Sequence, residues 1–398
     1  MDPKVTVSVP GRFHAFDLAA QLQQRGMLRR LITPYPAFKA MEWGLPRDKI
    51  CSILPIEVMK RLWTRLPASI SSHSAAWDVF NRIFEEVAAR RIPTDTDIFV
   101  GWSGSALSGI RRAKKLGAVT IVERGSSHIQ TQTELLLKEY RLHGGTPHVA
   151  TQHTTKTEIA EYSEADFICV PSGFAKQSFL HRGVSERKLL HIPYGVDLSS
   201  FHPEPKRDNV FRIVHCGGIS FRKGVHHLLQ AFKELNLPNS ELWLIGAVSP
   251  EIDDYSRKHP CLGVTFRGTF PQSLLFHEFS QASVFALASI EEGLALVIPQ
   301  AMACGLPVVC SGNTGGADVV RHGVDGFVFL AGDIEALKVH LRWCYEHQDR
   351  LTEMGQSARQ SVQTEFSWDD YGDRIEAAYR NILGQRQPFQ RSLEGELE

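Results

Sequence analysis

Residues 291 to 309 combine side chains and backbone groups that suit a phosphorylated ligand. They read EEGLALVIPQAMACGLPVV, with an acidic residue, Glu292, followed by Gln300 eight positions later. Pro299 lacks an N–H group and is tolerated only in the first turn of a helix, so the helix begins at about Leu296. Unpaired backbone N–H groups at residues 294–297, together with the helix dipole, then favour a phosphate beside Glu292.

A second loop-to-helix junction carries two adjacent cations. Arg222 and Lys223 follow the run FRIVHCGGIS, in which Gly217 and Gly218 allow a ligand to approach the backbone closely. A guanidinium offers a planar two-pronged contact to phosphate, and an ammonium offers a point charge. Taken alone, a solvated helix start explains this pair as well as a phosphate clamp does, and Glu292 taken alone is better explained as a loop acid that caps a helix.

The elements that position these residues alternate between strand and helix. Apolar, β-branched runs such as KVTVSV, DIFVGWSG, AVTIVERGSS and FICVPSG each end in small residues before a helical segment, and the same order returns in FRIVHCGG, ELWLIGA, VTFRGTF, SVFALAS and LPVVCSG. Strands separated by helices predict parallel sheets, which bind ligands beyond the carboxyl ends of their strands. We expect two doubly wound α/β domains that face a central cleft, with a linker at residues 196–209.

Composition excludes several classes of protein. The chain has 398 residues, too long for one ordinary core, and its 44 Lys and Arg balance 44 Asp and Glu, which removes the electrostatic case for a nucleic-acid partner. Seven scattered cysteines without a CxxC pair indicate buried thiols in a reducing compartment. The sequence has no apolar leader and no stretch near the ~20 apolar residues of a membrane span, so a cytoplasmic location is expected.

The chain resembles the family 4 glycosyltransferases, which have the GT-B fold and are retaining enzymes that use nucleotide sugars. Glu292 and Gln300 are similar to the family's E-x7-E signature, with glutamine in place of the second glutamate. Other segments match the family in the right order: IPYGVDLSSFHP its linker, GGISFRKGVHHLLQAF its phosphate-binding loop, GNTGGADVVRHGVDGFVF its glycine-containing stretch, and FSWDDYGDRIEAAY its closing helix.

The resemblance implies a domain organisation. Residues 1–200 would form the acceptor-binding domain and residues 201–370 the donor domain. Residues 371–398 would form a helix that packs back on the N-terminal domain, and a tail.

The resemblance also assigns the donor side of the site. Glu292 would contact the hydroxyls of the donor sugar, and Arg222 and Lys223 would hold the diphosphate. Gln300 would stand at the nucleotide ribose, where a glutamine cannot accept two hydroxyl protons with a charged carboxylate, so weaker nucleotide binding or lost activity is expected. The full donor set comprises Gly217, Gly218, Arg222, Lys223, Glu292, Gly293, Leu294, Ala295, Leu296 and Gln300.

The acceptor side is expected in the N-terminal half. Gly11, Arg12 and His14 lie in the first loop, VPGRFHAFD. A second loop, VERGSSH, holds Glu123 nearest the position where family members often carry a catalytic histidine, with His128 five residues along. The sequence leaves open which of these two faces the anomeric carbon, and a histidine at a strand end is as often an ordinary hydrogen-bond partner.

The expected reaction is the transfer of a hexose-type sugar from a nucleotide diphosphate sugar to a hydroxyl of a carbohydrate, a lipid-linked acceptor or a small molecule. No cofactor and no metal are expected, because Asp95 and Asp97, which imitate a D-x-D metal motif, precede a strand and indicate a turn. Two alternatives stay open: a phosphorolytic enzyme of similar architecture, which needs a lysine for pyridoxal phosphate, and a non-catalytic sugar- or nucleotide-binding relative, which Gln300 favours.

Residues 56–67, IEVMKRLWTRLP, suggest a peripheral membrane contact. Their helical period sets Lys60, Arg61 and Arg65 among Met59, Leu62 and Trp63, an arrangement that can lie on an anionic membrane such as the inner membrane face. The alternative is an ordinary amphipathic helix packed on the first sheet.

Overall fold

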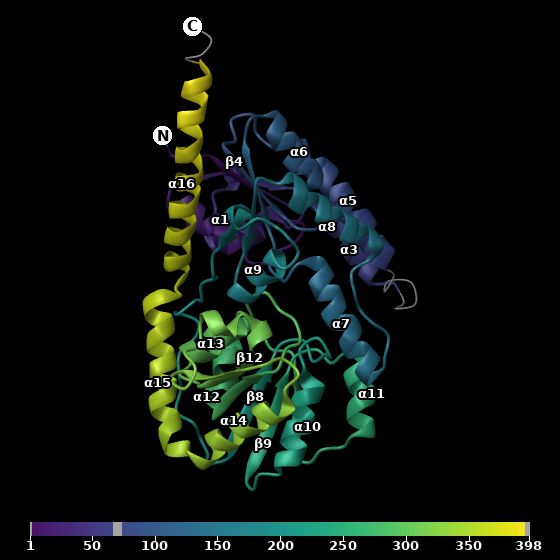
Figure 1. Cartoon of the computed structure of the whole chain (residues 1–398), viewed down its shortest axis with the longest axis vertical. Helices are drawn as coiled ribbons and strands as arrows, with labels where there is room; N and C mark the ends of the chain where they lie inside the picture. Colours follow the sequence, from purple (N-terminus) through teal and green to yellow (C-terminus); the bar gives the residue numbers. More distant parts are fainter. Residues whose placement is uncertain (1, 67–73, 395–398) are drawn as a thin grey trace.

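Two parallel β-sheets form the centres of two domains (Figure 1). The computed structural model describes residues 2–66 and 74–394. The N-terminal sheet has the order β3-β2-β1-β4-β5-β6-β7 and the C-terminal sheet β10-β9-β8-β11-β12-β13, with parallel pairing throughout. The strands are β1 (Val5–Ser8), β2 (Leu28–Thr33), β3 (Ile50–Ser52), β4 (Ile98–Trp102), β5 (Val119–Glu123), β6 (Phe167–Val170), β7 (Leu189–His191), β8 (Phe211–Cys216), β9 (Ser240–Ile245), β10 (Val264–Gly268), β11 (Val284–Leu287), β12 (Val308–Ser311) and β13 (Gly326–Phe329).

Helices connect successive strands and cover the sheets (Figure 1). The N-terminal domain contains α1 (Ala15–Gln24), α2 (Ala37–Ala40), α3 (Leu54–Thr64), α5 (Ser74–Ala89), α6 (Leu107–Lys115), α7 (Ile129–His143), α8 (Gln152–Glu164) and α9 (Gly173–Leu180). The C-terminal half contains α10 (Val225–Leu235), α11 (Pro250–Lys258), α12 (Leu275–Ser280), α13 (Val297–Ala303), α14 (Ile334–Glu346), α15 (Gln348–Glu365) and α16 (Trp368–Glu394).

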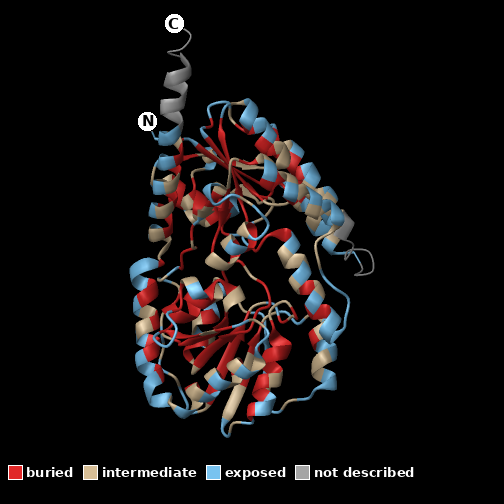
Figure 2. Ribbon diagram, viewed as in Figure 1, coloured by how far each residue is buried: buried red, intermediate tan, exposed pale blue. Residues whose placement is uncertain are grey.

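The central strands are buried on both faces, as their continuous apolar sequences predict. Every residue of β1, β4, β5, β8, β11 and β12 is buried, and Figure 2 shows the central strands of both sheets in the colour of buried residues. Parallel sheets need this double cover because their crossover helices pack on both sides. The expected α/β fold with two doubly wound parallel sheets is therefore confirmed.

The chain returns to the N-terminal domain through α16. This helix lies along α1, where Arg25 donates to the carboxylate of Asp373 over 2.5 Å, and Tyr371, Ile375 and Tyr379 are fully buried (Figure 1). A Cβ on Gly195 would lie 2.6 Å from the backbone of Trp368, so the two connections between the domains cross in close contact. The C-terminal helix thus adds a covalent and packed tie between the domains.

The segment that suggested a membrane contact, residues 56–67, packs some of its side chains against the protein and exposes others. Ile56 is buried, Lys60 donates to the carbonyl of Pro10 over 2.9 Å, and Arg61 pairs with Glu57. Val58, Met59 and Leu62 are exposed, whereas Pro67 at the end of the segment lies outside the described residues. Two of the three cations that suggested a basic membrane-facing surface are thus engaged within the protein. Among the described residues, no helix is both long and apolar enough to cross a membrane.

Candidate active site at the domain interface

The loops at the carboxyl ends of both sheets meet at backbone contact distance. A Cβ added to Gly293, after β11, would lie 2.2 Å from the carbonyl oxygen of Gly125, after β5. Gly315, after β12, has a φ of +73°, and a Cβ there would lie 2.5 Å from the carbonyl oxygen of Gly293. Only glycine fits positions where backbones approach this closely. The topology therefore brings the loop after β5 of one domain against the loops after β11 and β12 of the other.

A buried carboxylate, that of Glu291, joins the two domains at this contact. Its Oε1 accepts hydrogen bonds from Ser126 Oγ at 2.8 Å, from the Ser127 backbone at 2.9 Å and from Ser127 Oγ at 2.7 Å. Its Oε2 accepts from Gln132 at 2.8 Å and from Arg222 Nε at 3.1 Å. Burial raises the pKa of Glu291, but Arg222 and these donors lower it by more, so the pKa lies below its usual range. The group is an ionised carboxylate at neutral pH.

The two predicted cations lie together beside this carboxylate. Arg222 pairs with Glu291 at 3.0 Å, and Lys223 forms an ion pair with Glu292. Arg222 keeps 39% of its side-chain surface exposed, and a Cβ on the exposed Gly218 would meet open space. Two cations, two carboxylates and an accessible backbone therefore converge at the end of β8, and a diphosphate site there stays a prediction.

The loop before α13 forms more backbone hydrogen bonds than the sequence suggested. The amide of Ala295 donates to the carbonyl of Thr314 and that of Glu292 to the carbonyl of Asn313, both at 3.0 Å. The expectation that all amides of residues 294–297 are unpaired is therefore wrong at Ala295, because the loop after β12 supplies an acceptor. Gln300 is buried within α13, one turn beyond its start.

The N-terminal loops bring together His14 and Glu123. His14 Nε2 lies 3.4 Å from Glu123 Oε2, and both side chains are buried. The His14 ring packs against Tyr194 and Trp102, with centroid distances of 4.1 and 4.9 Å. Glu123 Oε1 has no hydrogen-bond partner within the part of the chain that the structure describes. Arg12, in the same loop as His14, does not join this pair and stacks on Trp43 instead.

His128 is not part of this pair. It is the N-cap residue of α7, where its Nδ1 accepts from the amide of Gln130 at 3.2 Å, and its ring packs against Tyr162 and Phe179. Burial and the nearby Arg182 lower the pKa of His128 to about 4, so the ring is neutral at pH 7. Of the two candidates in the VERGSSH loop, the structure therefore places Glu123, and not His128, beside the first loop.

Several interface residues were missed by sequence reasoning. Glu291 immediately precedes the predicted Glu292, and the serines of the VERGSSH loop indicated only small residues at a strand end. A second contact links Ser172 Oγ to the carbonyl of Gly293 at 2.6 Å, and the carboxylate of Asp318 accepts from the amide of Gly173 at 3.0 Å. The only available signal was the position of these residues at strand ends, which does not show which of them face the other domain.

Part of the C-terminal domain matches a known family. Residues 199–361 match the family described as glycosyl transferases group 1. The GDP-mannose-dependent alpha-(1-6)-phosphatidylinositol monomannoside mannosyltransferase of Mycolicibacterium smegmatis is 26% identical over 236 residues, which cover 54% of this chain and 62% of that protein. The chain thus spans less than two thirds of the length of this curated relative.

Solved structures show the same fold over nearly the whole chain. Sucrose-phosphate synthase from Thermosynechococcus elongatus has a TM-score of 0.69 and 18% identity, with 96% of this chain and 100% of that chain covered. Anabaena HepE in complex with UDP-glucose has a TM-score of 0.67 and 17% identity, with 95% and 99% covered. The fold is therefore GT-B, as expected, and the named relatives support a glycosyltransferase of this type.

The buried carboxylate predicts a pH-dependent loss of stability. Glu291→Gln removes the charge that Arg222 faces and should lower the free energy of unfolding by about 2 kcal/mol at pH 7, the usual contribution of charge-assisted hydrogen bonds. Because the pKa of Glu291 is depressed on folding, its contribution is complete above about pH 4.3 and is lost as the pH falls through the lower, folded value. The difference between wild type and variant, measured by urea unfolding, should therefore shrink below pH 4.3.

Glu335→Gln is the matched control. Glu335 also pairs with a cation, Lys338, but its side chain is 80% exposed, so its loss should change stability by less than about 0.5 kcal/mol. Equal losses in the two variants would contradict the role assigned to Glu291.

Proposed function

We propose that the protein is a retaining glycosyltransferase of the family 4 type that moves a hexose-type sugar from a nucleotide diphosphate sugar to a hydroxyl acceptor. The observation that carries this proposal is the convergence of Arg222 and Lys223 with Glu291 and Glu292 where the carboxyl ends of both sheets meet. This is the edge at which doubly wound sheets bind ligands.

Transfer requires stabilisation of a departing diphosphate. Breaking the bond between the anomeric carbon and the phosphate leaves positive charge on the sugar ring and negative charge on the diphosphate. Arg222 and Lys223 are fixed cations at that place, and fixed charges in a partly buried site are among the strongest contributors to catalysis. Their present carboxylate partners hold both side chains in position before a ligand arrives. On this assignment the transfer needs no metal and no cofactor.

The remaining donor groups follow from the same geometry. Glu292 would accept hydrogen bonds from the sugar hydroxyls, while the exposed Gly218 would admit the diphosphate to the backbone. Gln300, within α13, would lie at the nucleotide ribose.

The acceptor would approach the N-terminal loops. The buried pair joins Glu123, at the carboxyl end of β5, to His14, in the loop after β1 that also holds Gly11 and Arg12. In this arrangement Glu123 orients His14, which can accept a proton from the attacking hydroxyl. A carbohydrate, a lipid-linked or a small-molecule hydroxyl would satisfy these groups equally well.

A panel of nucleoside diphosphates tests the donor site. Thermal unfolding is measured with UDP, GDP, ADP and TDP in the presence of EDTA. The preferred nucleotide, at a hundredfold excess over its Kd, should stabilise the protein by about 2.7 kcal/mol, a shift of several degrees. Arg222→Ala should weaken its binding by roughly tenfold or more, whereas Arg257→Ala, on the exposed face of α11, should leave it unchanged.

The absence of a shift with all four nucleotides would remove the main support for a transferase. Slow hydrolysis of the matching nucleotide sugar without an acceptor would support transfer. Phosphate-dependent release of a sugar phosphate would indicate the phosphorolytic alternative, and binding without turnover the non-catalytic one.

Gln300→Glu should tighten binding of the preferred nucleotide. A carboxylate can accept both ribose hydroxyl protons, whereas the amide offers one acceptor oxygen. The expected gain is about 1 kcal/mol, or roughly fivefold in Kd, measured by calorimetry. A lower affinity in the variant would show that Gln300 does not contact the ribose.

We also propose a peripheral membrane contact through α3, which would suit a lipid-linked acceptor. Val58, Met59 and Leu62 are exposed on this helix, and Lys60 ties it to Pro10, beside the exposed Phe13 of the first loop. In vesicle flotation with anionic lipid, the double variant Met59→Ser/Leu62→Ser should bind at least about tenfold more weakly than wild type, because each apolar side chain contributes ~1.5 kcal/mol or more when buried. Leu262→Ser, at a site 96% exposed in the other domain, is the control. Wild-type protein that does not float would contradict the contact.

A further inference from the structure

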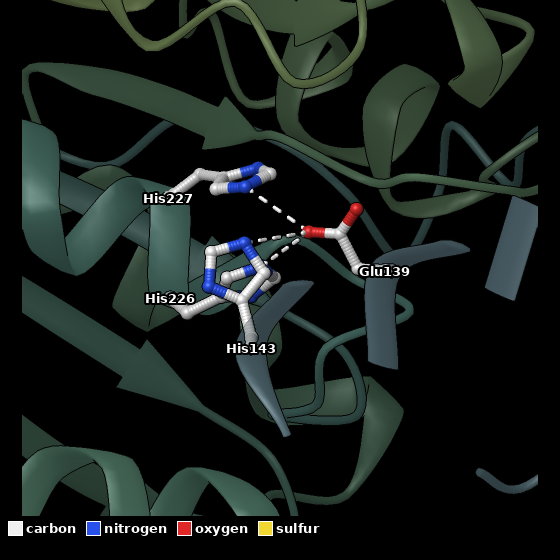
Figure 3. A group of neighbouring side chains, drawn as sticks. All are labelled: Glu139, His143, His226 and His227. Carbon is white, nitrogen blue, oxygen red and sulfur yellow. Dashed lines mark hydrogen bonds and ion pairs between the residues drawn. The ribbon is translucent and has the colours of Figure 1, made fainter. Parts of the chain in front are cut away.

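A second cluster of chemically active side chains lies at the domain interface, outside the proposed active site. Figure 3 shows Glu139 and His143 from α7 facing His226 and His227 from α10. Two ligand-type residues thus come from each domain. Glu139 and His143 are four residues apart and lie on one face of their helix, as metal-binding pairs on helices require.

The four groups have the spacing of a small coordination site. Glu139 Oε1 lies 2.6 Å from His226 Nε2, 3.1 Å from His227 Nε2 and 3.4 Å from His143 Nε2. All four candidate ligand atoms lie within 4.8 Å of one another. Ligands around a tetrahedral Zn²⁺ at 2.0–2.1 Å are separated by about 3.4 Å. Small side-chain movements would therefore suffice to place an ion among them.

The negative charge of the buried Glu139 carboxylate is not balanced by a permanently charged side chain among the described residues. Glu139 is buried, and among the described residues it has no Lys or Arg partner, only the three histidines. A carboxylate and three imidazoles are ligand types that a divalent transition metal binds.

The rings of His226 and His227 share Glu139 as their polar partner. His226 and His227 are buried, and within the described residues their Nδ1 atoms have no hydrogen-bond partner, so their polar contacts all point to Glu139. The ring of Phe221 packs against His226 and His143, with centroid distances of 4.5 and 5.9 Å. Such an apolar wall limits water at the site.

We propose that Glu139, His143, His226 and His227 bind one divalent transition metal, with Zn²⁺ the best fit, and that this ion clamps the two domains together. Three imidazoles and one carboxylate suit zinc, and a site with four protein ligands is structural, not catalytic. The clamp would act on the start of α10, because His226 and His227 lie in the first turn of that helix. Lys223 lies only three residues before His226, so the clamp would also restrain the segment that carries Lys223. This inference does not rest on the proposed transfer reaction.

Metal titration of the full-length protein tests this site directly. After EDTA treatment and its removal, Zn²⁺ should bind with a stoichiometry of one and raise the unfolding temperature by mass action. Co²⁺ should give the visible absorption of a tetrahedral nitrogen and oxygen site. His143→Asn and Glu139→Gln should each weaken Zn²⁺ binding at least about tenfold. His340→Asn, in a histidine pair with His322 within the C-terminal domain, should bind as wild type does.

The outcomes separate the alternatives. Absence of stoichiometric Zn²⁺ binding would overturn the proposal and leave the cluster as a set of hydrogen bonds. Binding that persists in both ligand variants would also overturn the proposal. A sulfur-to-cobalt charge-transfer band would overturn it as well, because the band would show that cysteines hold the ion. His143 is the most exposed member of the cluster, at 25% of its side chain, so its variant should fold; circular dichroism without metal verifies this.

Discussion

The buried carboxylate of Glu291 is the interaction on which the arrangement of the two domains depends. Its donors come from the loop after β5, from α7 and from Arg222, so one charged group collects hydrogen bonds from both domains. Separating the domains would leave that carboxylate without most of its partners, and a buried charge that loses its partners is costly. The position of Arg222 at the proposed diphosphate site is therefore coupled to closure of the interface.

Close contacts between backbone segments also constrain how the two domains fit together. Gly293 and Gly315 bring loops from three strands into contact, and Ser172 bonds the carbonyl of Gly293 from the N-terminal side. Hydrogen bonds of this kind have short range, so they form only if the glycines allow the backbones to meet. Charge and shape thus specify the same relative placement of the two sheets.

The sequence predicts the fold well because continuous apolar strands separated by helices have few alternatives. It also places Lys223 and Glu292 at loop ends, where the structure pairs them. It does not distinguish Glu292 from Glu291, nor Glu123 from His128, because adjacent or nearby residues differ only in which surface they face in the folded protein. The His226–His227 pair lies in a segment that indicated only a phosphate loop, and its partners on α7 are more than 80 residues away in the chain.

The two carboxylates at the interface differ in how their charge is balanced. Glu291, from the C-terminal domain, has a fixed cation in Arg222, whereas Glu139, from the N-terminal domain, pairs with histidines alone among the residues that the structure describes. A diphosphate arriving at Arg222 and Lys223 would compete with Glu291 and Glu292 and so would weaken two ion pairs within the C-terminal domain. A cation held by Glu139 would instead strengthen a contact between the domains. Because α10 follows Lys223 and carries His226, both ligands would act on the same short segment.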